Sequence, residues 1–219
     1  MERIAVVAFD VGETLVDETR IWSRWADRLG VTRLSMLGVL GAMAALDRPH
    51  LDAFEILRPG IDLDAELARW RADDPGGLRE NFDGDDLYGD VRPCFDALHA
   101  AGRRVIIAGN QPPQARAALE AMGLGVDAIL ISDELGAQKP TAAFFDAVVG
   151  AAGVASGEIA YVGDRLDNDV LPARQAGMRT VLLKRGPWGY LHARRPDAAL
   201  ADVVTDSLAG LSALLDALS

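Results

Sequence analysis

Two aspartates in this sequence have the type and position of catalytic residues. Asp10 ends the apolar run 4–9 and opens a glycine-containing turn, and Asp164 follows the apolar run 159–163 in the same way. Carboxylates at the ends of buried strands lie at the sheet edge where ligands bind. Hard cations such as Mg²⁺ take oxygen ligands. Two predicted strands that are each followed directly by an aspartate therefore predict a cation site.

A lysine stands between these two aspartates in the sequence. Lys139 is followed by Pro140, which restricts the backbone of the residue before it. A fixed ammonium group close to a reacting phosphoryl group can stabilise the charge that develops there. The order acid, lysine, acid therefore predicts phosphate chemistry.

The elements that must position these residues alternate between strand and helix patterns. Apolar, β-branched runs predict five buried parallel strands at residues 4–9, 104–108, 128–131, 159–162 and 180–183. Apolar residues at helical spacing follow the second, third and fourth runs, over residues 112–122, 141–152 and 169–176. This alternation predicts an α/β fold with a doubly wound, Rossmann-like parallel sheet. Asp10, Gly109-Asn110 and Asp164 fall at the carboxyl ends of its strands, where ligands bind.

Residues 17–88 interrupt the alternation. They contain helical patterns at residues 21–29, 34–46 and 63–71 and no convincing strand. We therefore predict an α/β core domain formed by residues 1–16 and 89–219, and a small helical domain at 17–88. Its three tryptophans are interpreted as the core of that helical unit, with an aromatic wall facing the substrate as the alternative; they are Trp22, Trp25 and Trp70.

Composition excludes several classes of function. The 219 residues carry a formal net charge of −11 and no long Lys/Arg run, which argues against binding to nucleic acid. The run 34–46 is too short for a membrane span. The N-terminal residues lack the long apolar core of a signal peptide, so we expect a cytoplasmic protein. Cys94, the single cysteine, cannot form an internal disulfide. A monomer and a homodimer both remain open.

Three motifs together resemble those of the haloacid dehalogenase (HAD) superfamily. They are the run 9–15, Lys139-Pro140 with Phe144 downstream, and the run 163–169 followed by residues 176–178. The resemblance covers essentially the whole chain and includes a helical cap inserted after the first motif. It implies a hydrolase in which Asp10 attacks phosphorus and forms a covalent aspartyl phosphate.

The same resemblance implies roles for the other motif residues. Mg²⁺ would be held by the Asp10 and Asp164 carboxylates and by the backbone carbonyl of Gly12. Lys139 would neutralise charge on the nucleophile and on the transferring phosphoryl oxygens. Asp169 would orient Lys139 or a metal-bound water.

Two positions depart from the pattern of the phosphatases in this superfamily. Gly12 stands where a second aspartate usually acts as general acid and base, and Glu13 is a candidate replacement. Gly109 stands where a Ser or Thr hydroxyl usually binds the phosphoryl group. Backbone N–H groups there, with the Asn110 side chain, are candidate substrate ligands, as is Lys139.

Three function classes remain open at this stage. The first is a Mg²⁺-dependent phosphatase for a small phosphorylated metabolite, best suited to good leaving groups. The second is a HAD-like protein with little turnover that binds a phosphorylated ligand or a protein partner. The third is carbon–halogen hydrolysis through attack by Asp10. The first class predicts phosphate release, the second predicts ligand binding without phosphate release, and the third predicts halide release that needs no metal.

Overall fold

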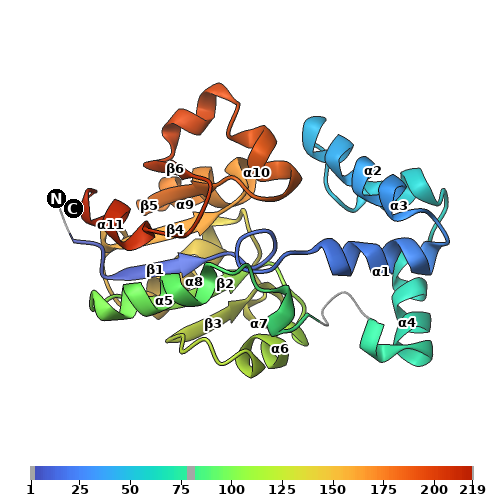
Figure 1. Ribbon diagram of the computed structural model, residues 1–219, viewed down its shortest axis with the longest axis horizontal. Helices are drawn as coiled ribbons and strands as arrows, with labels where there is room; N and C mark the ends of the chain where they lie inside the picture. Colours follow the sequence, from blue (N-terminus) through green and yellow to red (C-terminus); the bar gives the residue numbers. More distant parts are fainter. Residues whose placement is uncertain (1–2, 78–81, 219) are drawn as a thin grey trace.

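A six-stranded parallel sheet forms the centre of the larger part of the molecule (Figure 1). The computed structural model describes residues 3–77 and 82–218. The sheet has the order β3-β2-β1-β4-β5-β6, which confirms the predicted fold class. The strands are β1 (Val6–Phe9), β2 (Arg104–Gly109), β3 (Ala128–Ile131), β4 (Ile159–Gly163), β5 (Arg179–Leu183) and β6 (Val203–Thr205). The sequence pattern predicted the first five and missed β6, which has three residues at the sheet edge.

The strand order reverses at β1. Phe9 pairs with Ile107 of β2 on one side and with Val162 of β4 on the other. The strands are parallel, so the residues that follow β1, β2 and β4 lie side by side at one edge of the sheet. The backbone N–H of Asp10 donates to the carbonyl of Val162 at 2.9 Å. Asp10 is therefore fixed at the switch point where ligands bind in such sheets.

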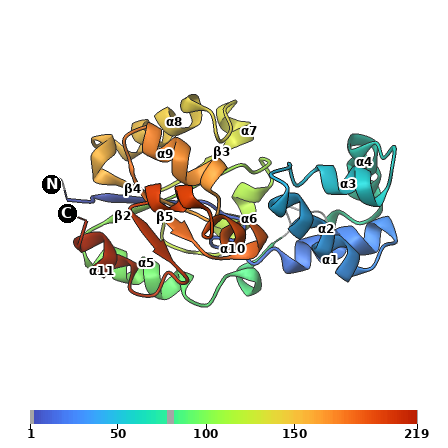
Figure 2. The same ribbon diagram turned by 90° about the horizontal axis from the view of Figure 1, so that it is seen from above.

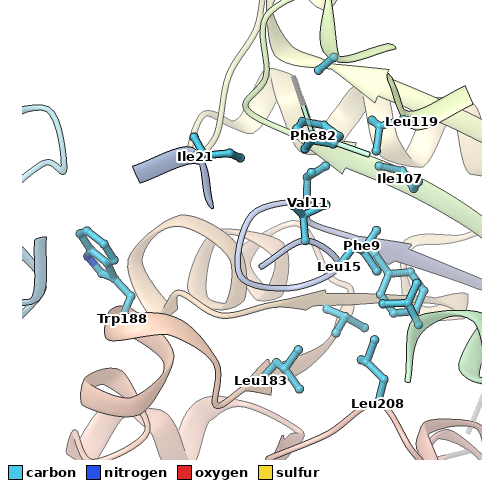
Figure 3. Packing of buried hydrophobic residues seen from close by; sticks show 14 of the residues in the cluster. Phe9, Val11, Leu15, Ile21, Phe82, Ile107, Leu119, Leu183, Trp188 and Leu208 are labelled. Atoms are coloured by element: carbon cyan, nitrogen blue, oxygen red, sulfur yellow. The ribbon is translucent and has the colours of Figure 1, made fainter. Parts of the chain in front are cut away.

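Helices cover both faces of the sheet (Figure 2). One face packs against α5 (Val91–Ala100), α6 (Ala115–Ala121) and α11 (Leu211–Asp216), and the other against α8 (Ala142–Ala152) and α9 (Leu171–Gln175). Figure 3 shows the first of these cores, in which Phe9 and Ile107 lie with Leu119 and Leu208. Burial on both faces explains why the strands read as continuous apolar runs. The helix predicted at 169–176 corresponds to α9, and a wider helical turn, Leu166–Val170, directly precedes α9.

Between β1 and α5, the described part of the chain forms four α-helices that lie beyond the carboxyl edge of the sheet (Figures 1 and 2). They are α1 (Thr19–Leu29), α2 (Arg33–Ala45), α3 (Asp52–Leu57) and α4 (Leu63–Asp73). The sequence predicted three of them and missed the six-residue α3. The Trp25 ring lies 4.7 Å from the rings of both Phe54 and Trp70, so Trp25 and Trp70 form the core of this unit as predicted. The domain boundaries at 16/17 and 88/89 stay a prediction, and residues 78–81 lie outside the described residues.

Two further short helices are α7 (Ser132–Leu135), after β3, and α10 (Gly186–His192), after β5. α10 packs against α2. Across the described ranges, every helix is too short or too polar to span a lipid bilayer.

His192 is completely buried at the end of α10. Its Nδ1 accepts a hydrogen bond from the backbone N–H of Leu166 at 3.0 Å. Burial lowers the pKa of His192, and the charge of Arg195 lowers it further, against the opposing charges of Asp167 and Asp47. The folded protein therefore holds this imidazole in its neutral form.

This histidine should make stability depend on pH. The unfolded chain protonates His192 near pH 6.5 and the folded chain only at lower pH, so the unfolded state binds more protons below about pH 6.5. The stabilisation is present above that pH and is lost as the pH falls. We expect the free energy of unfolding in urea to fall less between pH 7.5 and 5.5 in His192→Gln than in the wild type. The exposed His99→Gln serves as control and should behave as the wild type does.

Candidate active site

Asp10, Lys139 and Asp169 form a buried ionic cluster at the carboxyl edge of the sheet. The Lys139 Nζ lies 2.6 Å from Asp10 Oδ1 and 2.6 Å from Asp169 Oδ1. Asp169 is 0% exposed and Lys139 is 3% exposed, whereas Asp10 retains 8% of its surface. The lysine therefore bridges an inaccessible carboxylate and one that a ligand can reach.

Asp169 reaches this position because Gly163 leaves room for it. A Cβ atom at Gly163 would lie 2.4 Å from the Asp169 carboxyl carbon, too close for any side chain. The second Asp169 oxygen accepts the backbone N–H of Arg165 at 3.0 Å. Both oxygens of Asp169 are thus engaged, and the residue is placed to orient Lys139.

The charges of the cluster do not balance. Burial by itself would lower the pKa of Lys139, but the charges of Asp10 and Asp169 raise it well above its usual value, so the ammonium group stays charged. Burial raises the pKa of Asp164 well above its usual value, and the neighbouring charges of Asp169 and Asp10 add to the effect. Lys139 contacts two of the three acidic groups, Asp10 and Asp169. The positive charge that acts on Asp164 is that of Arg165.

These three carboxylates offer a site for a metal ion. One oxygen from each of Asp10, Asp164 and Asp169 lies within 4.8 Å of the others. Clustered, buried carboxylate oxygens suit a hard divalent cation, and the added positive charge would relieve their mutual repulsion. The cluster could therefore hold a metal, and the part that the Gly12 carbonyl plays in it stays a prediction.

Asn110 holds the backbone of Lys139. Its side-chain Nδ2 donates to the carbonyl of Lys139 at 3.0 Å, and its Oδ1 accepts the Lys139 N–H at 2.8 Å. A Cβ atom at Gly109 would lie 3.0 Å from both Asp10 Oδ1 and a methyl carbon of Val11, so a hydroxyl-bearing side chain there would crowd Asp10. The substrate-binding role predicted for Gly109 and Asn110 stays a prediction, and the bonds seen favour a positioning role for Asn110.

A cleft of about 620 Å³ opens above the ionic cluster. Asp10, Lys139 and Asp164 line it from the sheet edge, and Trp22 and His50 line it from the helical insert. Pockets for small molecules usually measure about 300–1,000 Å³. The insert therefore helps to enclose a space that suits a small metabolite.

Further lining residues come from the segments that follow β4 and β5. The Arg165 guanidinium lies 4.9 Å from the centre of the Trp188 ring, and both residues line the cleft. Trp188 belongs to the same buried apolar cluster as Phe9 and lies at the left of it in Figure 3. Neither residue was assigned a role from the sequence: Arg165 lies inside the motif 163–169 but is not one of its predicted site residues, and Trp188 lies in the segment after the last predicted strand.

Glu13 braces the turn that carries Asp10. Its two oxygens accept hydrogen bonds from Tyr88 Oη at 2.6 Å and from the Glu18 backbone N–H at 2.9 Å. Burial raises the pKa of Glu13 to about 7, and the nearby charge of Glu18 adds to the shift. A Cβ atom at Gly186 would lie 2.6 Å from Glu13 Cγ, so a glycine is needed there. Glu13 is therefore held as part of the framework of the turn.

Residues 4–177 match the family model of the haloacid dehalogenase-like hydrolases. The chain belongs to this family. This confirms the family that the three motifs predicted, and the helical region after β1 agrees with the predicted cap insertion.

Two curated relatives of this HAD-like hydrolase are named as phosphatases. This chain is 41% identical over 69 residues to the glyceraldehyde 3-phosphate phosphatase of Methanopyrus kandleri. That match covers 32% of this chain and only 30% of the relative. The chain is 31% identical over 175 residues to the phosphoserine phosphatase of Thermus thermophilus, covering 74% of this chain and 68% of that protein.

The fold alone does not distinguish between reactions. A 2-haloacid dehalogenase from Pseudomonas syringae aligns with a TM-score of 0.60 at 22% identity, covering 99% of this chain and 100% of that one. Proteins named for two different reactions therefore share this architecture, and the choice between them depends on the site.

Proposed function

We propose that this chain is a Mg²⁺-dependent phosphatase that acts on a small phosphorylated metabolite through an aspartyl phosphate on Asp10. The observation that carries the proposal is the Asp10 carboxylate, which opens to the 620 Å³ cleft while Lys139 contacts it at 2.6 Å. The names of the curated relatives support phosphate esters of small metabolites as substrates.

In this reaction an Asp10 oxygen forms a bond to phosphorus, and the bond from phosphorus to the leaving group breaks. Water then attacks the phosphorus of the aspartyl phosphate and returns the carboxylate. Lys139, held by Asp169, neutralises charge near the nucleophile. Asp10 and Asp164 would hold Mg²⁺, with Asp169 beside them, and the bound ion would supply charge neutralisation to the phosphoryl oxygens.

The test measures phosphate release from a panel of small phosphate esters with Mg²⁺ and with EDTA, and halide release from 2-haloacids in parallel. We expect phosphate release that requires Mg²⁺. Asp164→Asn should need at least about tenfold more Mg²⁺, and the exposed Asp96→Asn should match the wild type.

A second readout is independent of turnover. Mg²⁺ should raise the Tm of the wild type, because it binds the folded carboxylate cluster, and should raise that of Asp164→Asn less. Halide release without metal would replace the proposal with a dehalogenase. Metal binding with no release of either product would replace it with a ligand-binding protein.

A further inference from the structure

The carboxyl group of Glu18 occupies the space that a side chain at position 12 would fill. A Cβ atom built on Gly12 would lie 2.6 Å from Glu18 Oε1 and 2.8 Å from its Cδ. Both distances are shorter than non-bonded contacts, so a side chain at position 12 would have to push the Glu18 carboxyl group aside. The glycine two residues after the nucleophile thus makes room for an acid that comes from elsewhere in the chain.

Helix α1 sets the orientation of this carboxyl group. Glu18 is the N-cap residue of α1, yet its side chain makes no capping hydrogen bond. Instead, Oε2 accepts a hydrogen bond from the Trp22 Nε1 one turn later, at 3.0 Å. Indole nitrogen only donates, so Oε2 acts as an acceptor. Oε1 is the oxygen closer to Gly12, and it is the one in position to carry a proton.

Glu18 lines the same cleft as Asp10, and its carboxyl group lies against Gly12. The other carboxyl groups at this site have different tasks: Asp47 pairs with Arg195 and Asp167 with Arg165. Asp10 and Asp169 contact Lys139, and Asp164 lies with them in the possible metal cluster. Glu13 accepts hydrogen bonds on both oxygens from Tyr88 and from the Glu18 backbone. Glu18 is therefore the carboxyl group best placed for proton transfer to a bound substrate.

We propose that Glu18 is the general acid and base of this enzyme, an assignment that rests on the proposed phosphatase function. As the bond from phosphorus to the leaving oxygen breaks, its electron pair stays on that oxygen, which takes the Glu18 proton and departs as an alcohol. The Glu18 carboxylate then takes a proton from the water that attacks the aspartyl phosphate. Inorganic phosphate leaves, Asp10 regains its carboxylate, and Glu18 is protonated again.

The dependence on the leaving group tests this role. An alkoxide is a poor leaving group and needs a proton, whereas 4-nitrophenolate and acetate leave without one. Glu18→Gln keeps an acceptor for Trp22 but cannot donate a carboxylic proton. We expect its kcat/KM for alkyl phosphates to fall by about 10²–10⁴, and its kcat/KM for 4-nitrophenyl phosphate and acetyl phosphate to stay within about threefold of the wild type. The exposed Glu120→Gln is the matched control and should change neither.

A rescue variant separates proton transfer from a structural role. The φ angle of Gly12 is not in the left-handed region, so its backbone accepts an aspartate, which would displace the Glu18 carboxyl group. Gly12→Asp alone exchanges one acid for another and should not raise kcat/KM, whereas Gly12→Asp combined with Glu18→Ala should exceed Glu18→Ala in kcat/KM for alkyl phosphates by at least about tenfold.

Each outcome decides between the two proposals. Equal losses on alkyl and aryl phosphates in Glu18→Gln, without rescue, would overturn the role of Glu18 and leave the phosphatase standing. If no phosphate ester releases phosphate in an Asp10-dependent way, both the proposed function and the role of Glu18 fall.

Discussion

Asp10→Asn is expected to lower kcat by at least about 10⁴-fold while the protein remains folded. An amide has nearly the same shape as a carboxylate but is a poor nucleophile, so no aspartyl phosphate can form. The substitution also removes one of three clustered buried carboxyl groups, and Lys139 still pairs with Asp169. We therefore expect the Tm to stay level or to rise.

The measurement pairs phosphate release with detection of the covalent intermediate. Acid quenching during turnover of a ³²P-labelled substrate should leave label on the wild type and none on Asp10→Asn. Asp96→Asn, which makes the same change at an exposed position on α5, should retain both label and rate. Turnover by Asp10→Asn within tenfold of the wild type would remove Asp10 from the role of nucleophile.

The sequence was informative where chemistry depends on the ends of strands. Asp10 and Asp164 follow apolar runs that become adjacent parallel strands, and that adjacency follows from the fold class. The roles assigned to Lys139 and Asp169 depended on resemblance to the family, and the structure brings both beside Asp10. Periodicity located the long helices, whereas α3 and β6 are too short to show it.

The rest of the site depends on contacts that no local pattern encodes. Glu13 meets Tyr88 across 75 residues, and Gly186 packs against Glu13 from the segment after β5. Glu18 is six residues from Gly12, a spacing with no meaning until the turn and the start of α1 bring them together. From the sequence, Glu13 was the candidate replacement for the general acid. In the structure both of its carboxyl oxygens accept hydrogen bonds, which favours a role in holding the turn that carries Asp10. A missing side chain could be noticed in the sequence, but what fills its space could not.

Lys139→Met is expected to lower the free energy of unfolding by about 3–5 kcal/mol, because it leaves buried carboxylates without their counter-charge. The lysine Nζ lies 2.6 Å from both Asp10 and Asp169, and Asp169 is completely buried. Methionine keeps most of the side-chain volume, so the loss reports charge rather than packing. Urea unfolding at pH 7.5 in EDTA measures it.

The chain's other lysine provides the matched control. Lys184 pairs with Asp206 at the surface, where the Asp206 side chain is 72% exposed, so Lys184→Met should cost no more than about 1 kcal/mol. Equal small losses at both positions would show that the cluster does not need its ammonium group. If repulsion between the carboxylates is the cause, a divalent cation should replace part of the missing charge. Mg²⁺ should therefore stabilise Lys139→Met more than the wild type, whereas a loss due to packing alone would leave the two Mg²⁺ effects equal.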